Sequence, residues 1–115
     1  MNYFKPDEFK CNCGCGTDVK QELKDKANEA RDKAGVPFIV SSGARCPAWN
    51  KHEKGAKNSK HMQGLAMDIR CTDSVSRFKI VKAMIDVGFT GLDIASNYVH
   101  GDIAHDPPMI FIYRK

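Results

Sequence analysis

His61 and Asp68, a histidine and an aspartate seven positions apart, are the residues whose types and spacing point most directly to chemistry. Over residues 65–69 apolar side chains alternate with Ala66 and Asp68, which predicts a strand with Asp68 on its open face. His61 precedes this strand in a turn. Because imidazole nitrogen and carboxylate oxygen both bind zinc, the stretch predicts half of a metal site.

A second stretch supplies the ligand that the first one lacks. Over residues 98–104, strand alternation places His100 and Asp102 together on one face. If the two strands are neighbours, His61, Asp68 and His100 converge as two imidazoles and one carboxylate. Three protein ligands that leave a fourth position for water are typical of a catalytic zinc site. Each residue taken alone is more often an ordinary surface or turn residue.

Length and composition limit what the rest of the chain can be. With 115 residues, 42% hydrophobic and 28% charged, we expect one domain, residues 1–115, with one modest core. No run approaches the roughly 20 apolar residues of a membrane span, and no signal peptide is visible, so we expect no membrane insertion. The net charge of +4 suits an anionic partner, but the basic residues are scattered. We expect a monomer without a nucleic-acid partner.

The five cysteines are an odd number, which excludes a framework that pairs all of them within one chain. Three lie in the run Cys-Asn-Cys-Gly-Cys-Gly at residues 11–16, while Cys46 and Cys71 stand alone. Structural zinc sites usually combine two Cys-x2–4-Cys halves. A second metal is one interpretation of this loop, and a packed or partly disulfide-bonded loop is the favoured one.

Two helices are predicted from apolar residues at helical spacing. The first covers residues 18–34, with Thr17 as its cap and Gly35 after its end. The second covers residues 74–87 and stops at Gly88. The residues expected to face the core are Val19, Leu23, Ala27, Ala30 and Ala34 in the first helix and Val75, Phe78, Val81, Met84 and Ile85 in the second.

The remaining stretches predict strands and loops. Phe4 and Phe9 are expected in the core, and residues 48–60 as a long surface loop. Strands are expected at residues 37–41, 65–69, 91–95, 98–104 and 109–113. This order predicts an α+β fold, with a small, mainly antiparallel sheet and helices packed on one side.

Four motifs in this order resemble those of a known family of zinc peptidases. They are Asp-Glu-Phe-Lys-Cys at residues 7–11, Ser-Gly-Ala-Arg-Cys-Pro at 42–47, Asn-Ser-Lys-His-x-x-Gly-x-Ala-x-Asp at 58–68 and Val-His-Gly-Asp at 99–102. They resemble the D-alanyl-D-alanine carboxypeptidases and L-alanyl-D-glutamate endopeptidases of peptidoglycan, whose fold is shared with the hedgehog signalling domain. The chain is most similar to the short members of phages and prophages.

The resemblance implies a hedgehog-like fold with His61, Asp68 and His100 as zinc (Zn2+) ligands. It also implies that Arg45 holds a carboxylate of the substrate peptide, with a surface ion pair as the alternative. Ser59 is expected to support the ligand turn or to contact the substrate, with a simple turn hydrogen bond as the alternative.

The sequence departs from the family pattern at two places. The tyrosine of the family's Ser-Gly-Tyr-Arg turn is Ala44 here. Many members also carry a general base as an acid three positions before the last histidine ligand or as a histidine two before it, where this sequence has Asn97 and Tyr98. Asp102 is therefore expected to be the general base or to orient His100.

The expected activity is zinc-dependent hydrolysis of amide bonds in bacterial peptidoglycan stem or cross-link peptides, during phage lysis or entry. The protein would be made in the cytoplasm of a bacterial host and act on the wall after release or as a virion component. Two alternatives remain: a non-haem iron oxygenase built on His100 and Asp102, and an inactive, zinc-stabilised binding module. His52 and His105 are expected at the surface, and Trp49 as a cleft wall or a core anchor.

Overall fold

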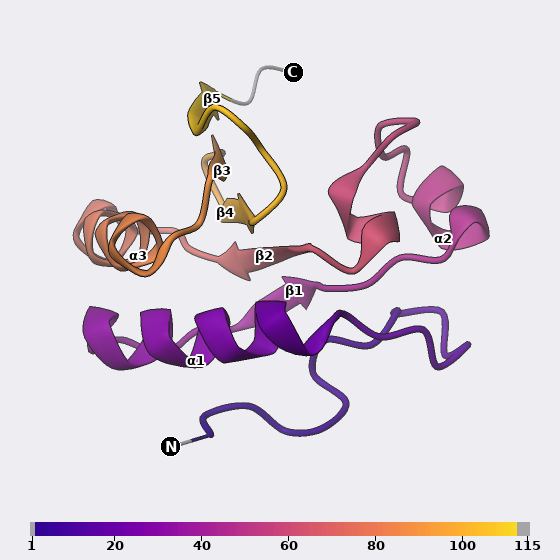
Figure 1. Cartoon of the computed structure of the whole chain (residues 1–115), viewed down its shortest axis with the longest axis horizontal. Helices are drawn as coiled ribbons and strands as arrows, with labels where there is room; N and C mark the ends of the chain where they lie inside the picture. The colour runs from indigo at the N-terminus through magenta and orange to yellow at the C-terminus, as the bar shows by residue number, and fades with distance from the viewer. Residues whose placement is uncertain (1, 113–115) are drawn as a thin grey trace.

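A five-stranded sheet organises the part of the chain that the computed structural model describes, residues 2–112 (Figure 1). The sheet has the order β1-β2-β4-β3-β5; only β3 and β5 pair in parallel, and the other neighbours are antiparallel. The predicted α+β fold with a mainly antiparallel sheet is therefore confirmed. The strands are β1 (Val40–Ser42), β2 (Ala66–Arg70), β3 (Gly91–Ile94), β4 (Tyr98–Asp102) and β5 (Met109–Ile112). The predicted end of the last strand, Tyr113, lies outside the described residues.

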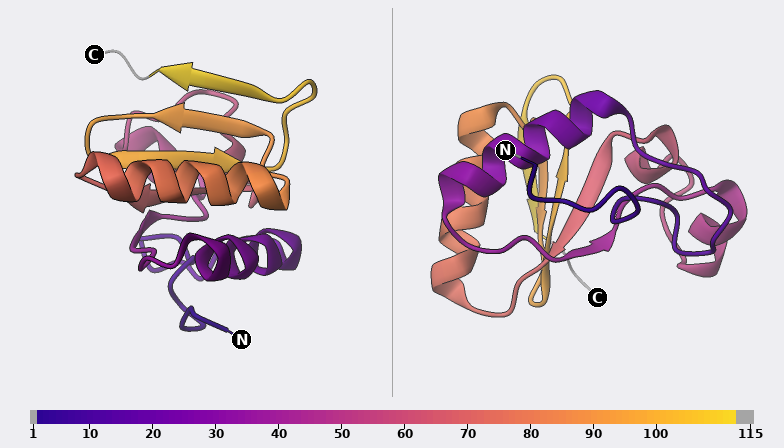
Figure 2. Two further views of the ribbon diagram at one scale, coloured as in Figure 1. Left: turned by 90° about the vertical axis from the view of Figure 1, so that its left-hand side faces the viewer. Right: turned by 90° about the horizontal axis from the view of Figure 1, so that it is seen from below.

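The two long helices, α1 (Gln21–Ala34) and α3 (Ser74–Val87), pack against each other on one side of the sheet, as predicted (Figure 2). A short helix, α2 (Pro47–His52), lies on the other side, followed by the 3₁₀ helix η1 (Lys60–Gln63). The stretch predicted as one long loop thus contains a helix, which Pro47 begins at its first turn. Among the described residues, no helix has the length and apolar character needed to cross a membrane.

Helix α1 begins at Gln21, later than predicted, because Thr17 is not its cap. The Thr17 carbonyl instead accepts a hydrogen bond from the Cys11 amide at 2.7 Å. The helix ends as predicted at Gly35, whose φ of 67° is left-handed and suits glycine. All five side chains predicted to face the core from this region are buried.

The core-facing stripe predicted for α3 is wrong at three positions. Val75, Phe78 and Ile85 are 67%, 69% and 51% exposed. The helix packs against the alanine-rich face of α1 through a different row of side chains, which also has helical spacing. This row is harder to recognise in the sequence because one of its members is a small alanine. The buried residues are Ile80, Ala83, Met84 and Val87.

The N-terminal segment is tied to the loop that follows β1. Phe4 and Phe9 are buried as predicted, with ring centroids 4.8 Å apart. The Phe9 carbonyl accepts a hydrogen bond from the Ala44 amide at 2.8 Å. A Cβ on Gly43 would collide with the Phe9 backbone, so glycine is required where the two segments meet.

Candidate metal site

Strands β2 and β4 place Asp68 and His100 side by side on the face of the sheet that points away from α3. The two residues are direct cross-strand partners. The next residue of β4, Gly101, faces the helices, because a Cβ there would meet Met84 of α3. Successive strand residues alternate between faces, so His100 and Asp102 share the opposite one, as predicted.

His61 reaches the same place from η1. The Ser59 hydroxyl accepts a hydrogen bond from the His61 amide at 3.2 Å and caps this short helix. Gly64 ends the helix with a φ of 73°, and the chain enters β2 directly afterwards. The Ser59 contact is the local turn hydrogen bond that was the alternative for this residue, and it lies at the start of the turn that carries His61.

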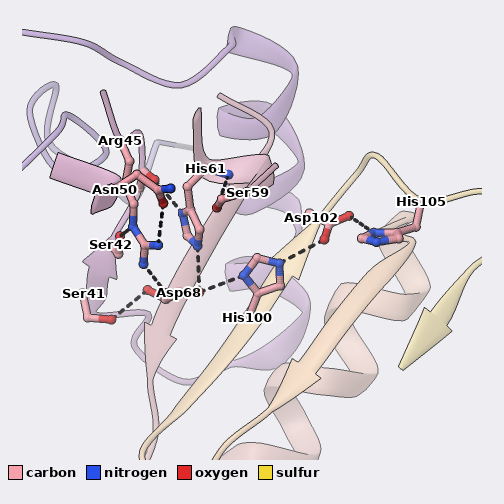
Figure 3. Close-up of polar contacts among 11 residues, drawn as sticks. Ser41, Ser42, Arg45, Asn50, Ser59, His61, Asp68, His100, Asp102 and His105 are labelled. Carbon is pink, nitrogen blue, oxygen red and sulfur yellow. Dashed lines mark hydrogen bonds and ion pairs between the residues drawn. The ribbon is translucent and has the colours of Figure 1, made fainter. Parts of the chain in front are cut away.

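The three residues predicted as a ligand set converge (Figure 3). His61 Nε2 lies 3.2 Å from Asp68 Oδ1, and His100 Nδ1 lies 2.9 Å from the same oxygen. One ligand atom from each side chain lies within 4.8 Å of the other two, close enough for all three to hold one ion.

Hydrogen bonds on the outer side of each imidazole show that this donor set fits a metal. His61 Nδ1 lies 2.7 Å from the Gly43 carbonyl, and His100 Nε2 lies 2.9 Å from Asp102 Oδ2. A neutral ring that donates through its outer nitrogen leaves the inner nitrogen free as a ligand. Two neutral imidazoles and one carboxylate match the ligand set of catalytic zinc sites.

Asp102 is engaged by histidines on both of its oxygens. Oδ2 accepts from His100, and Oδ1 accepts from His105 Nδ1 at 2.7 Å and from the Ala104 amide at 3.1 Å (Figure 3). The residue is only 1% exposed. Of the two roles predicted for Asp102, orientation of His100 is the one that these contacts match. His105 is half-buried in this network, so its prediction as a plain surface residue is wrong.

Arg45 contacts the other oxygen of the central carboxylate. Its Nη2 lies 3.4 Å from Asp68 Oδ2, while Nε donates to Ser42 Oγ at 3.0 Å and Nη1 to Asn50 Oδ1 at 3.3 Å. These contacts use three of the five N–H donors of a guanidinium. Arg45 also lines the cavity beside the ligands, so its remaining donors can face a bound molecule.

Asn50 is a buried support for Arg45 that the sequence did not reveal. It is 4% exposed, accepts from Arg45 and donates from Nδ2 to the Ala56 carbonyl at 3.0 Å. A Cβ on Gly55 would collide with the Asn50 side chain, so the loop packs directly on this amide.

We expect Asn50→Ala to lower the free energy of unfolding by about 1–3 kcal/mol, because it leaves buried polar groups unpaired. Urea denaturation measures this loss. Lys57→Ala, an exposed position in the same loop, is the matched control and should change little. An Asn50→Ala protein as stable as the control would show that the amide does not brace the loop.

Asp93 is a second residue that the sequence analysis missed. It is the cross-strand partner of His100 in β3, so the row Asp68–His100–Asp93 runs across three strands on one face. Its Oδ1 is buried and has no hydrogen-bond partner among residues 2–112. The sequence does suggest that Asp93 lies on the open face of a strand, because apolar Leu92 and Ile94 flank it as apolar residues flank Asp68. Only the strand register shows that Asp93 lies next to His100.

A cavity of about 460 Å³ opens over this row. Its lining includes the three metal-site residues, Arg45, Ser59, Asp93, Asp102 and His105, together with the loop residues 53–56. Trp49 lies outside this lining and stacks on the exposed His52 with ring centroids 4.7 Å apart. Of the two places expected for Trp49, a cleft wall or a core anchor, the first does not apply to this cavity.

His100 and the two aspartates that it contacts, Asp68 and Asp102, shift one another's pKa. Burial opposes the charged form of His100, but hydrogen bonds to Asp102 and Asp68 outweigh it and raise the pKa of His100 to about 9. Burial likewise favours neutral carboxyls, but the bonds from His100 and His105 lower the pKa of Asp102 to about 2. The pKa of Asp68 is lowered against its burial by His100 and His61. Without metal, His100 is therefore ion-paired with Asp68 and with Asp102.

The metal-free protein is expected to lose stability as the pH rises from 6.5 to about 9. A pKa raised on folding contributes stability that is fully present below the unfolded value of 6.5 and is lost as the pH passes the folded value of about 9. A bound metal would replace the Nδ1 proton of His100 and remove this dependence. Urea midpoints at several pH values, with chelator and with zinc, measure the effect. A flat profile in chelator would contradict it.

When the sequence is compared with models of known protein families, one family matches most of the chain. The family model described as Peptidase M15 matches residues 2–103, which include the three candidate ligands, Arg45 and Asp102. No curated protein matches the chain.

Proposed function

Because this metallopeptidase belongs to the peptidase M15 family, we propose that it cleaves amide bonds in the stem or cross-link peptides of bacterial peptidoglycan. The observation that carries the proposal is the convergence of His61, Asp68 and His100 in an open cavity, with each imidazole held from outside. That arrangement suits a reactive metal rather than a purely structural one, since structural sites are closed by four protein ligands.

The proposed cofactor is zinc, held by His61, Asp68 and His100. Zinc bound there would polarise the scissile carbonyl and lower the pKa of a bound water. With zinc bound, the Gly43 carbonyl and the Asp102 carboxylate would each accept a hydrogen bond from the outer ring nitrogen and hold the two rings in the tautomer that the ligand role requires.

Arg45 is proposed to hold a carboxylate of the substrate. Its guanidinium lines the cavity beside Asp68, and its planar N–H groups suit bidentate contact with a carboxylate. Peptidoglycan stem peptides carry free carboxylates, and the chain has a net charge of +4. Anchoring one end of the peptide would fix the amide over the ligands. Ser59, which also lines the cavity, would contact the same peptide.

Asp93 is proposed to accept and return the proton during hydrolysis. A general base needs a free lone pair within reach of the proton it takes. Both oxygens of Asp102 already accept hydrogen bonds from histidines, whereas Asp93 has a buried oxygen without a partner among the described residues. Asp93 lines the cavity next to His100, so it can serve the amide nitrogen that leaves.

The proposed setting is degradation of the bacterial wall in phage lysis or entry, by a monomer made in the host cytoplasm and acting after release or as a virion component. The net charge of +4 and the anionic character of peptidoglycan support this setting.

Digestion of purified peptidoglycan tests the proposal. We expect zinc-loaded protein to release peptides whose new termini, read by mass spectrometry, name the bond. Chelation and His61→Ala should abolish release, while Lys57→Ala should preserve it. A folded, zinc-loaded protein that releases nothing would instead support a binding module of the same fold.

A further inference from the structure

Four of the five cysteines form a second cluster, separate from the candidate metal site of His61, Asp68 and His100. They are Cys11, Cys13 and Cys15 from the N-terminal loop and Cys46 from the start of α2. Cys11 Sγ lies 3.4 Å from Cys13 Sγ and 3.9 Å from Cys46 Sγ, and Cys13 Sγ lies 3.7 Å from Cys46 Sγ. All four sulfurs lie within 4.8 Å of one another.

We propose that these four thiolates bind a second, structural zinc ion. Zn–S bonds of about 2.3 Å in a tetrahedron separate neighbouring sulfurs by about 3.8 Å. The separations among Cys11, Cys13 and Cys46, at 3.4, 3.7 and 3.9 Å, are close to that value. Four sulfur ligands leave no position for water, so this ion would hold the fold together and would not take part in hydrolysis.

The local backbone is shaped to bring three cysteines of one short loop together. Gly14 and Gly16 have φ values of 85° and 89°, which glycine adopts without strain. The Gly14 amide donates to the Cys11 carbonyl at 3.1 Å and closes a tight turn between the first and third sulfur ligands. In an extended strand the same three cysteines would share one face but would follow one another at about 6.6 Å, too far apart to ligate one ion, whereas these turns draw them together.

Backbone amides also point at two of the sulfurs. The Trp49 amide donates to Cys46 Sγ at 3.4 Å, and the Cys46 amide donates to Cys11 Sγ at 3.5 Å. Hydrogen bonds from amides stabilise a thiolate, the form of cysteine that binds metal.

The proposal also accounts for the odd number of cysteines. All five are free in the structure, and Cys71 is buried and lies apart, with its Sγ 3.4 Å from the Asp73 carbonyl. A four-thiolate site therefore uses every cysteine except the one enclosed in the core. The alternative is disulfide bonding within the cluster. Two disulfides would use all four cysteines, and one disulfide would leave two of them as free thiols.

This second ion would stiffen the turn that serves the first site. Cys46 follows Arg45 directly, and the same turn holds Gly43, whose carbonyl orients His61. The cysteine loop and the Phe9–Ala44 hydrogen bond clamp that turn from the N-terminal side. The proposal is nevertheless independent of the peptidase activity, because it predicts a metal content and not a reaction.

Zinc content and cobalt spectra of the full chain, purified under reducing conditions, test the second site. We expect two zinc ions per chain in the wild type and in Cys71→Ser, and one in Cys46→Ser and in His61→Ala. When cobalt replaces zinc, His61→Ala should keep the near-ultraviolet charge-transfer absorption of thiolate ligands, and Cys46→Ser should lose it.

His61→Ala keeps the test decisive if Cys46→Ser fails to fold, since it leaves all cysteines in place. A His61→Ala protein that binds cobalt without thiolate absorption, or binds none, would overturn the proposal. A non-reduced wild-type mass lower by two hydrogens for each pair of cysteines, with no metal bound, would assign the cluster to disulfides instead.

Discussion

Asp68→Asn is expected to lose the zinc held by His61, Asp68 and His100 and to reduce peptide release by about three orders of magnitude or more. The amide keeps the size of the side chain but removes the negative charge that both histidines and Arg45 contact. A catalytic metal contributes several kcal/mol to the transition state, and about 4 kcal/mol corresponds to a thousandfold.

Metal analysis and release rates should be measured on the same Asp68→Asn sample, with circular dichroism to confirm folding. Asp86→Asn is the matched control, because Asp86 is an exposed aspartate on α3, away from the cavity, that forms a salt bridge with Lys82. The control should retain metal and activity. An Asp68→Asn protein that is folded, metal-free at this site and still active would exclude the proposed centre.

Asp93→Asn and Asp102→Asn are expected to fail in different ways. Within residues 2–112 the ring nitrogens of His61 and His100 make no hydrogen bond to Asp93, so Asp93→Asn should keep its zinc and lose about 10²–10⁴-fold in kcat, the usual contribution of a general base. Asp102→Asn removes the carboxylate that holds His100, so it should weaken zinc binding by about 10–100-fold.

Zinc affinity by competition with a chelator, and kcat at saturating zinc, separate the two roles. Glu53→Gln, an acidic residue of the cavity rim, serves as the control for a general loss of negative charge. Full activity of Asp93→Asn at saturating zinc would remove Asp93 from the mechanism. A large loss of kcat confined to Asp102→Asn at saturating zinc would return the base to Asp102.

What the sequence predicted well depends on local patterns. Alternation around Asp68 and His100 indicates the face of a strand without knowledge of its neighbours, and Gly35 and Gly88 mark helix ends by their own conformational preferences. The convergence of the candidate ligands was predicted only on the condition that the two strands are neighbours, and β2 and β4 do pair. The same kind of pattern failed in α3, where two apolar stripes overlap and only the packing against α1 selects between them.

What the sequence did not reveal depends on contacts between distant segments. Asp93 becomes part of the site only through the register that sets it opposite His100. Asn50 is buried because the loop folds over it, and Cys46 joins the cysteine loop because Gly43 lets the Phe9 backbone approach. No spacing rule within one segment encodes these approaches.

The most direct test of the metal centre is anomalous diffraction at the zinc absorption edge from crystals of the zinc-loaded protein. We predict a peak about 2.0–2.2 Å from His61 Nε2, His100 Nδ1 and one oxygen of Asp68. A zinc-loaded crystal with no peak among these three atoms, or with zinc on the outer nitrogen His100 Nε2, would contradict the proposed centre.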